Sequence, residues 1–407
     1  MKIRIKFLAL LILFVLHSAI YGQISQTKLD ALQQSLEEIV GPVNRGGITV
    51  SAKVLHADFN KVLYEFKPGE SMIPASITKL VTACCAFTKL GQSYSIPTII
   101  YTDDNNISGG VINGNLYLKG FGDPDLSSSD ISNLAALFIA KNITKITGNI
   151  VADESYFDSQ YKGLSGYYSG DTGPSYWPYV SALCLDKSSG AVSAGNLLSA
   201  ILKSGGVQVD GTVISGVTPA GTKEICKVEH TLFDVLANMC KESDNQSAIT
   251  MFKLVGAKNS SDQGSLKTGQ EAVEKFLNEV GVNRYSYEIL EGSGLTRYNK
   301  VNADMYIKML KYMYDDRFLF DYFMNALAVA GKDGTLKNRM IGTAAEGNVH
   351  AKTGTLNGVS ALSGYVIDAD NEILIFFIDM NGFGGNANSM RSIQDDFAVT
   401  LANFSRK

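Results

Sequence analysis

The feature that most constrains the fold is a set of strand-like segments divided between the two ends of the chain. Residues 47–56 and 62–66 near the start, and 348–355, 358–367 and 372–380 near the end, are short apolar runs bounded by turn residues. Such runs are typical of β-strands. Strands from both ends can share one sheet only when the segment between them leaves the sheet and returns. We therefore expect a sheet whose first two strands come from the N-terminal part and whose last three come from the C-terminal part, with an insertion between them.

Turn and helix patterns support this outline. Residues 57–60 separate the first two strands, and Asn357-Gly358 predicts a hairpin turn near the end of the chain. Apolar residues at helical spacing predict helices that form one layer on each face of the sheet. These helices are expected at residues 29–40, 76–90, 230–239, 271–280, 305–314 and 388–402.

The middle of the chain has a different texture. From about residue 95 to 224 it alternates short β-like runs with Gly- and Ser-containing turns and has two short helical patterns, at 131–140 and 194–203. We interpret this stretch as an inserted, β-rich domain. The expected division is a signal peptide (1–22), the first part of the main domain (23–94), the inserted domain (95–226) and the second part of the main domain (227–407).

The N-terminus predicts export. Lys2, Arg4 and Lys6 precede an unbroken apolar run at 7–16, and small and polar residues follow as far as Gly22. This is the pattern of a secretory signal peptide. A membrane anchor is the alternative, but the apolar run is shorter than the ~20 residues that span a bilayer. We expect cleavage near Gly22, no transmembrane anchor after it, and location in the periplasm or cell envelope.

Composition excludes some partners. The chain has 407 residues, of which 45% are hydrophobic, so it can form two cores. The net charge of -4, without a block of like charge, does not fit a nucleic-acid-binding or anionic-membrane-binding protein. The five cysteines are an odd number without metal-ligand spacing, and we interpret them mainly as small buried residues. No Gly-x-Ser-x-Gly elbow supports a Ser-His-Asp triad.

Three short motifs occur in order along the chain, but each is weak evidence when taken alone. Copies of the first and the third also occur elsewhere in the chain, and we call these copies decoys. The decoys are Ser-x-x-Lys patterns at 25–28 and 159–162 and a second Lys-Thr-Gly at 267–269, which we expect to lie in a loop. Order and setting distinguish the real candidates from these. The three motifs are Ser76-Ile77-Thr78-Lys79, Ser243-Asp244-Asn245 and Lys352-Thr353-Gly354-Thr355.

The first motif can activate a nucleophile. Ser76 stands at the expected start of a helix, and positions i and i+3 of a helix share a face, so the Lys79 amine faces the Ser76 hydroxyl. A serine attacks well only when a neighbouring base removes its proton, and a lysine is such a base when burial or nearby positive charge keeps it neutral. Lys352 could supply that charge. The alternative is a capping serine beside a solvated lysine.

The other two motifs suit substrate handling. Ser243 and Asn245 lie in an expected connection between helices, where a hydroxyl and a carboxamide can relay a proton and hold an amide; a polar helix cap is the alternative. Lys352, Thr353 and Thr355 end an expected strand and suit a terminal carboxylate. Gly354 leaves room for another backbone to approach, as an edge strand that binds an extended peptide requires.

These motifs are similar to the Ser-x-x-Lys, Ser-x-Asn and Lys-Thr-Gly motifs of penicillin-binding proteins and serine β-lactamases. The chain resembles in particular the class C low-molecular-mass penicillin-binding proteins, the D-alanyl-D-alanine carboxypeptidase/endopeptidase family of the penicillin-binding protein 4 type (peptidase family S13). The segments that carry this resemblance are 74–76, 122–124, 177–183, 291–299 and 350–355.

The resemblance implies a fold and a mechanism. The fold is a β-lactamase/transpeptidase-like α+β domain, with a five-stranded antiparallel sheet flanked by helices, split by the insertion. Ser76, Lys79 and Ser243 would be catalytic, through an acyl-enzyme on Ser76. Asn245, Lys352, Thr353, Gly354 and Thr355 would bind substrate.

The same resemblance implies the partners. Peptidoglycan stem peptides and cross-links would be substrates and β-lactams covalent inhibitors, and neither a metal nor an organic cofactor is expected. A serine β-lactamase is one alternative, although it needs a dedicated deacylating base that we do not identify in the sequence. A non-catalytic penicillin-recognising module is the other.

Overall fold

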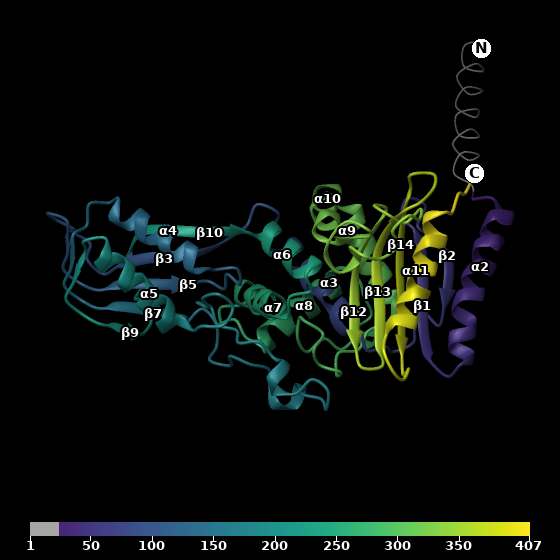
Figure 1. The fold of residues 1–407 in the computed structure, drawn as a ribbon, viewed down its shortest axis with the longest axis horizontal. Coiled ribbons are helices and arrows are strands. Elements are labelled where there is room, and N and C mark those ends of the chain that lie inside the picture. The colour runs from purple at the N-terminus through teal and green to yellow at the C-terminus, as the bar shows by residue number, and fades with distance from the viewer. Residues whose placement is uncertain (1–23) are drawn as a thin grey trace, which may run out of the picture.

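The computed structural model describes residues 24–407, so the expected signal peptide at 1–22 lies outside the described residues. The molecule is elongated, with the larger sheet at one end and the inserted region at the other (Figure 1). Both ends of the described chain lie at the end that holds the larger sheet. The α+β class expected from the sequence is confirmed.

The larger sheet unites the two ends of the chain as expected. Its strands are antiparallel and lie in the order β11-β12-β13-β14-β1-β2. The five long strands are those predicted from sequence, and β11 is a two-residue addition beside β12. Their bounds are β1 Thr49–His56, β2 Lys61–Phe66, β11 Ala328–Val329, β12 Val349–Leu356, β13 Val359–Ile367 and β14 Ile373–Asn381.

Both faces of this sheet are covered by helices, which is why its central strands are apolar on both sides. On β14, Phe376 and Ile378 belong to the same core as buried residues of α2 and α11, whereas Phe377 belongs to the core of the opposite face. The two helices of the first face are α2 (Gln26–Arg45) and α11 (Asn388–Ala402).

The opposite face carries the helices that position the candidate site. They pack into one large core together with residues of β13 and β14. These helices are α3 Thr78–Leu90, α6 Leu232–Lys241, α7 Asn245–Asn259, α8 Leu266–Glu279, α9 Ala303–Asp315 and α10 Arg317–Ala326. Short 3-10 turns are η1 Ala75–Ile77, η2 Ser165–Tyr167, η3 Pro174–Tyr176, η4 Arg284–Ser286 and η5 Gly334–Leu336.

The inserted region has its own core and two sheets. The larger has the order β10-β3-β5-β7-β9 and the smaller the order β4-β6-β8, and α4 and α5 pack on them. The bounds are β3 Ser95–Thr102, β4 Val111–Ile112, β5 Leu116–Gly120, α4 Ser128–Ile139, β6 Lys145–Ile146, β7 Ile150–Asp153, α5 Ala191–Ser204, β8 Gln208–Val209, β9 Val213–Ser215 and β10 Lys223–Thr231. β10 pairs with β3 as far as Thr231↔Ser95, past the boundary expected at residue 226. The helix expected from residue 230 therefore begins only at Leu232.

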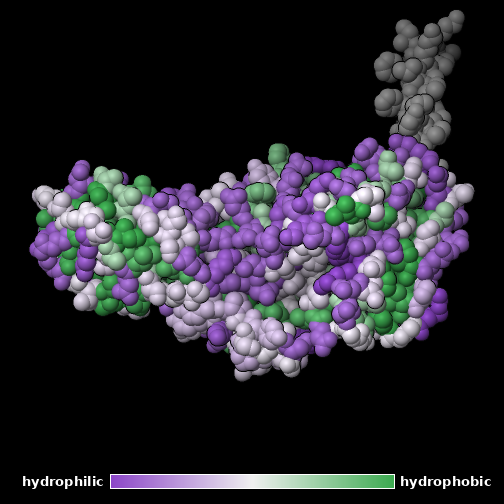
Figure 2. Space-filling view, in the orientation of Figure 1, coloured by the Kyte–Doolittle hydropathy of each residue, from purple (hydrophilic) through white to green (hydrophobic). Residues whose placement is uncertain are grey.

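The surface of the inserted region is partly apolar. Figure 2 shows hydrophobic residues at this end of the molecule, whereas hydrophilic residues dominate the middle. Exposed apolar side chains of the insertion include Leu137, Ile214 and Val217.

All five cysteines are buried, as expected, and all five thiols are free. Within residues 24–407, no helix combines the length and the hydropathy needed to cross a bilayer.

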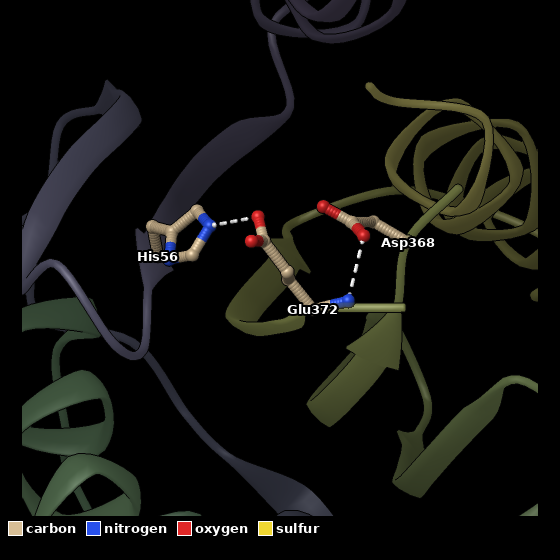
Figure 3. Close-up of side chains that lie close together, drawn as sticks. All are labelled: His56, Asp368 and Glu372. Atoms are coloured by element: carbon tan, nitrogen blue, oxygen red, sulfur yellow. Dashed lines mark hydrogen bonds and ion pairs between the residues drawn. The ribbon is translucent and has the colours of Figure 1, made fainter. Parts of the chain in front are cut away.

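A buried ionic cluster fastens one end of the larger sheet (Figure 3). His56, at the end of β1, bonds through Nε2 to Glu372 Oε2 at 3.0 Å. Arg406 donates to both oxygens of the same carboxylate, at 2.6 and 2.8 Å. Asp368 caps the turn between β13 and β14 by accepting the backbone N–H groups of Asp370 and Glu372. We call His56, Asp368, Glu372 and Arg406 the clasp; it ties β1, this turn and the C-terminal tail together.

Candidate active site

The first motif lies where η1 passes into α3. Ser76 is half-buried in η1, and Lys79 is fully buried on the first turn of α3. The Lys79 Nζ donates to the Ser76 Oγ across 3.0 Å, so the amine and the hydroxyl meet as the spacing predicts. The preceding Ala75 has a φ of +47°, an uncommon conformation for a residue with a side chain. Strain of this kind is concentrated at functional sites.

The Lys79 amine is held by neutral oxygen atoms. Its Nζ also donates to Asn245 Oδ1 and to the carbonyl oxygen of Ser293, each at 2.7 Å. Burial lowers the pKa of Lys79 to about 8, although the carboxylates of Glu291 and Asp244 act in the opposite direction. A lowered pKa gives the amine a larger neutral fraction near neutral pH, which is the form that can accept a proton.

The second motif occupies the connection between α6 and α7, as expected. Ser243 lies between the two helices with a φ of +60°, and Asp244 caps α7 by accepting the Ser247 N–H at 2.5 Å. Asn245 is the first residue of α7, from which its carboxamide reaches Lys79. The cap therefore fixes the start of the helix that carries the amide.

The third motif lies on β12, and Lys352 is fully buried there. Its Nζ donates to Ser243 Oγ and to the carbonyl oxygen of Thr353, both at 2.8 Å. Burial, and after it the positive charge of Lys79, lower the pKa of Lys352 to about 7. The lysine of the third motif and the serine of the second thus form one hydrogen-bonded pair.

Gly354 makes room for the backbone of the first motif. A Cβ at this position would lie 2.6 Å from the Pro74 carbonyl oxygen and 3.2 Å from the Ile77 nitrogen. The backbone that approaches Gly354 is therefore the chain's own η1. The strand edge nevertheless stays open beyond the first residues of β12, because β11 pairs only with His350 and Ala351.

A cleft of about 440 Å³ opens where the motifs meet. Ser76, Ser243, Thr353 and Thr355 line it, whereas the other motif residues do not. Three further lining residues carry no motif signal and were missed by the sequence analysis: Thr335, Arg339 and Arg391. They come from η5, the coil after it and α11.

A buried carboxylate organises the loop that presents the Ser293 carbonyl. Glu291 is fully buried and accepts the backbone N–H groups of Ser293, Gly294 and Thr296 at 2.6, 2.7 and 3.3 Å. Glu291 belongs to the segment 291–299 that carries the family resemblance, but its sequence context alone predicts no role for it. Its structural role is to shape a loop whose carbonyl binds the Lys79 amine.

The decoy motifs lie elsewhere. Lys28 is exposed on α2, and the 159–162 copy lies in a coil. The expectation that 267–269 forms a loop is wrong, because these residues make the first turn of α8. Ser265 and Thr268 form a capping box that starts the helix ahead of the expected position.

The inserted region reaches the second motif through a lysine. Lys187 Nζ lies 3.3 Å from Asp244 Oδ2 and 3.3 Å from Asp125 Oδ1. The cap of α7 is thereby joined to the insertion.

Among the described residues, the group with metal-ligand proximity is His56, Asp368 and Glu372 in the clasp. Arg406 already neutralises Glu372 there, so we interpret the group as an ion-pair network.

Comparison with known proteins indicates one family for residues 32–404. Residues 32–194 and 187–404 match the D-Ala-D-Ala carboxypeptidase 3 (S13) family. A D-alanyl-D-alanine carboxypeptidase from Actinomadura sp. is 29% identical, over 93% of this chain and 86% of the relative. The fold is similar to penicillin binding protein 4 (dacB) from Haemophilus influenzae, with a TM-score of 0.76, 24% identity and coverage of 92% and 98% of the two chains. It is also similar to a predatory endopeptidase from Bdellovibrio bacteriovorus, with a TM-score of 0.57, 19% identity and coverage of 85% and 91%.

Proposed function

The chain belongs to the D-Ala-D-Ala carboxypeptidase 3 (S13) family, and we propose that it is a serine-type D-Ala-D-Ala carboxypeptidase and endopeptidase acting on peptidoglycan stem peptides and cross-links. One observation carries the proposal: a buried amine, Lys79 Nζ, meets a cleft-lining hydroxyl, Ser76 Oγ, at 3.0 Å. A neutral amine in this position is a base for the serine. The names of the relatives, a D-alanyl-D-alanine carboxypeptidase and penicillin binding protein 4, support the same activity.

In the proposed acylation, Ser76 Oγ attacks the carbonyl carbon of the penultimate D-Ala while Lys79 takes the hydroxyl proton. The ester bond to Ser76 forms and the amide C–N bond breaks. The backbone N–H groups of Ser76 and Thr355 stabilise the oxyanion, an effect of roughly 3 to 4 kcal/mol per donor in comparable sites. Water then hydrolyses the ester and frees Ser76.

The leaving amine needs a proton, and Ser243 is placed in this scheme to deliver it. Its hydrogen bond to Lys352 at 2.8 Å supports this role, since a buried amine beside the hydroxyl can replenish its proton. Asn245 orients the acyl-side amide, and its Oδ1 fixes Lys79. Lys352, Thr353 and Thr355 hold the terminal carboxylate, or the equivalent carboxylate of a β-lactam, and no cofactor takes part.

Release of D-Ala tests the activity. The purified protein, incubated with a peptide that ends in D-Ala-D-Ala, should release D-Ala, and the Ser76→Ala variant should not. Digestion of cross-linked sacculi, followed by mass analysis of the fragments, measures opening of cross-links in the same preparation. Equal release by the wild type and Ser76→Ala would contradict the proposal.

A serine β-lactamase is the second enzymatic candidate. It differs in deacylation, which would have to be fast. Hydrolysis of a chromogenic cephalosporin separates the two: slow release after one acylation event per molecule is expected of the peptidase, and fast multiple turnover would overturn the assignment.

A non-catalytic penicillin-recognising module is the third candidate. It predicts reversible penicillin binding and no D-Ala release from any peptide. The hydrogen-bonded chains Lys79–Ser76 and Lys352–Ser243 favour the enzyme, because a module that only binds needs neither buried amine.

We further propose that the protein works in the cell envelope, after export and removal of residues 1–22. Fractionation of cells, followed by N-terminal sequencing, should give an envelope protein that begins near Gln23. A cytosolic protein that begins at Met1 would contradict this.

A further inference from the structure

The cleft extends beyond the groups that the proposed reaction uses. Its volume of about 440 Å³ lies in the range of sites that hold drug-sized ligands, whereas the leaving group of a carboxypeptidase is one alanine. The lining residues that have no role in the proposed reaction are Thr335, Arg339 and Arg391. Among residues 24–407, no acidic residue lines the cleft. The part of the cleft beside these three residues is therefore lined by polar and positively charged side chains.

The two arginines differ in how their charges are balanced. Arg339 lies 2.7 Å from Asp395 and also donates to Gln394 Oε1 at 3.1 Å, so its charge is already balanced within the protein. For Arg391 the hydrogen bond is to a neutral group, Asn388 Oδ1 at 3.0 Å, and no carboxylate of residues 24–407 pairs with it. Arg391 is the cation at the cleft that remains available to a ligand.

The position of Arg391 strengthens its effect. It lies in the first turn of α11, a helix of 15 residues that has no acidic residue in that turn. A helix N-terminus has a partial positive charge, so a cation there is unfavourable for the helix itself and adds to the attraction for an anion. Arg339 also donates to the Arg391 carbonyl oxygen at 3.1 Å and so fixes the backbone that carries the free guanidinium. Arg339 is thus a positioning residue.

We infer that Arg391, positioned by Arg339, forms a leaving-side subsite for a carboxylate additional to the one held by Lys352, Thr353 and Thr355. This inference rests on the proposed function and specifies its substrate: an acidic leaving peptide, as in a cross-link between two stem peptides. A single D-Ala leaves the subsite unused, because its only carboxylate is already bound.

A matched pair of substrates tests the subsite. Both have the same acyl side, ending in D-Ala, and the leaving residue is either D-glutamate, which has a second carboxylate, or its neutral analogue D-glutamine. The wild type should cleave the D-glutamate substrate with a kcat/KM roughly fivefold higher, and added salt should reduce this preference, because the ion pair is exposed. In Arg391→Gln the ratio should fall to about one, and in Arg391→Lys it should be intermediate.

The control is Arg317→Gln, which removes another exposed arginine at the start of a helix, α10, outside the cleft lining. Its ratio should equal that of the wild type. Penicillin labelling to completion verifies that each variant is folded. A ratio of one in the wild type, or an unchanged ratio in Arg391→Gln and Arg391→Lys, overturns the subsite. Failure of the wild type to cleave either substrate or to accept penicillin would instead overturn the proposed function.

Discussion

Two buried polar clusters of the main domain differ in how their positive charges are balanced. In the clasp, the Arg406 guanidinium pairs with the carboxylate of Glu372, which is also hydrogen-bonded to His56. In the candidate active site, Lys79 and Lys352 are bonded to hydroxyl, carboxamide and carbonyl oxygens, and neither is among the ion pairs of residues 24–407. Burial of a cation without a carboxylate destabilises its charged form.

The comparison distinguishes buried cations that are paired with a carboxylate from buried amines that are not. A third fully buried lysine, Lys253, lies 2.6 Å from Asp158 and resembles the clasp. Burial lowers the pKa of Lys253 too, but the hydrogen bond to Asp158 and the charge of that carboxylate oppose the shift. The Lys79 amine has no carboxylate bonded to it, so it loses its proton more easily and can act as a base. The predictions below separate the two kinds of cluster.

The largest effect is expected from Lys79→Ala. Acylation by a β-lactam should slow by at least ~100-fold, since the general base is lost, while the fold remains intact. Stopped-flow kinetics measure the rate. The control is Lys28→Ala in the decoy motif on α2, which should not change it. Acylation of Lys79→Ala at normal speed would rule out the assigned base.

Lys352→Ala should act on substrates with a carboxylate. We expect kcat/KM for a peptide ending in D-Ala-D-Ala to fall by roughly 10- to 100-fold, because a charge-assisted bond to the carboxylate is lost. The matched control is Lys267→Ala in the second Lys-Thr-Gly copy, whose side chain is 85% exposed. If both variants had the same kcat/KM as the wild type, the carboxylate would have to bind elsewhere.

The acylation rate should depend on pH through a lysine whose pKa is lowered. Neutral amine is the active form of the base, so the rate should rise about tenfold per pH unit below the midpoint and level off above it. The midpoint should lie near the lowered pKa of Lys79, about 8, rather than at the ordinary 10.5. A rate profile measured from about pH 6 to about pH 10 tests this. A midpoint above 10 would contradict the claim that Lys79, buried without a carboxylate partner, is the base.

The clasp should affect stability and leave acylation unchanged. Glu372→Gln should lower the free energy of unfolding by about 1 to 3 kcal/mol, because Arg406 and His56 lose their shared carboxylate. The exposed pair Glu279–Lys89 provides the control, Glu279→Gln, with an expected loss below about 0.5 kcal/mol. Chemical denaturation measures both variants. If Glu372→Gln were fully folded and still acylated more slowly than the wild type, the two clusters would be coupled.

The contribution of the clasp to the free energy of unfolding should decrease at acidic pH. Hydrogen bonds from Arg406 are the main cause of the lowered pKa of Glu372. The stabilisation is therefore present above the ordinary glutamate pKa of 4.5 and is lost as the pH falls through the lower value in the fold. The difference in stability between wild type and Glu372→Gln should shrink on acidification.

Much of the fold followed from local pattern. The five long strands and α11 lie where apolar runs and helical spacing put them, because both faces of the sheet are buried. The two-residue β11 is too short to leave a pattern, and it forms only because β12 is beside it. The start of α8 was misplaced because the capping box of Ser265 and Thr268 was read as part of a loop.

The site was predictable to the extent that its residues belong to compact motifs. Ser76 and Lys79 are one helical turn apart, so their contact follows from spacing. Arg339 and Arg391 line the cleft only through the packing of α11 and the coil after η5. Nothing in the sequence around either arginine indicates that its side chain lines the cleft.

The most direct test of the central claim is the mass of the covalent adduct with penicillin. We predict one penicilloyl group per molecule, on Ser76, absent from Ser76→Ala and formed much more slowly in Lys79→Ala. A folded protein that accepts no penicillin, or that carries the adduct on another residue, would contradict the claim that the unpaired amine of Lys79 activates Ser76.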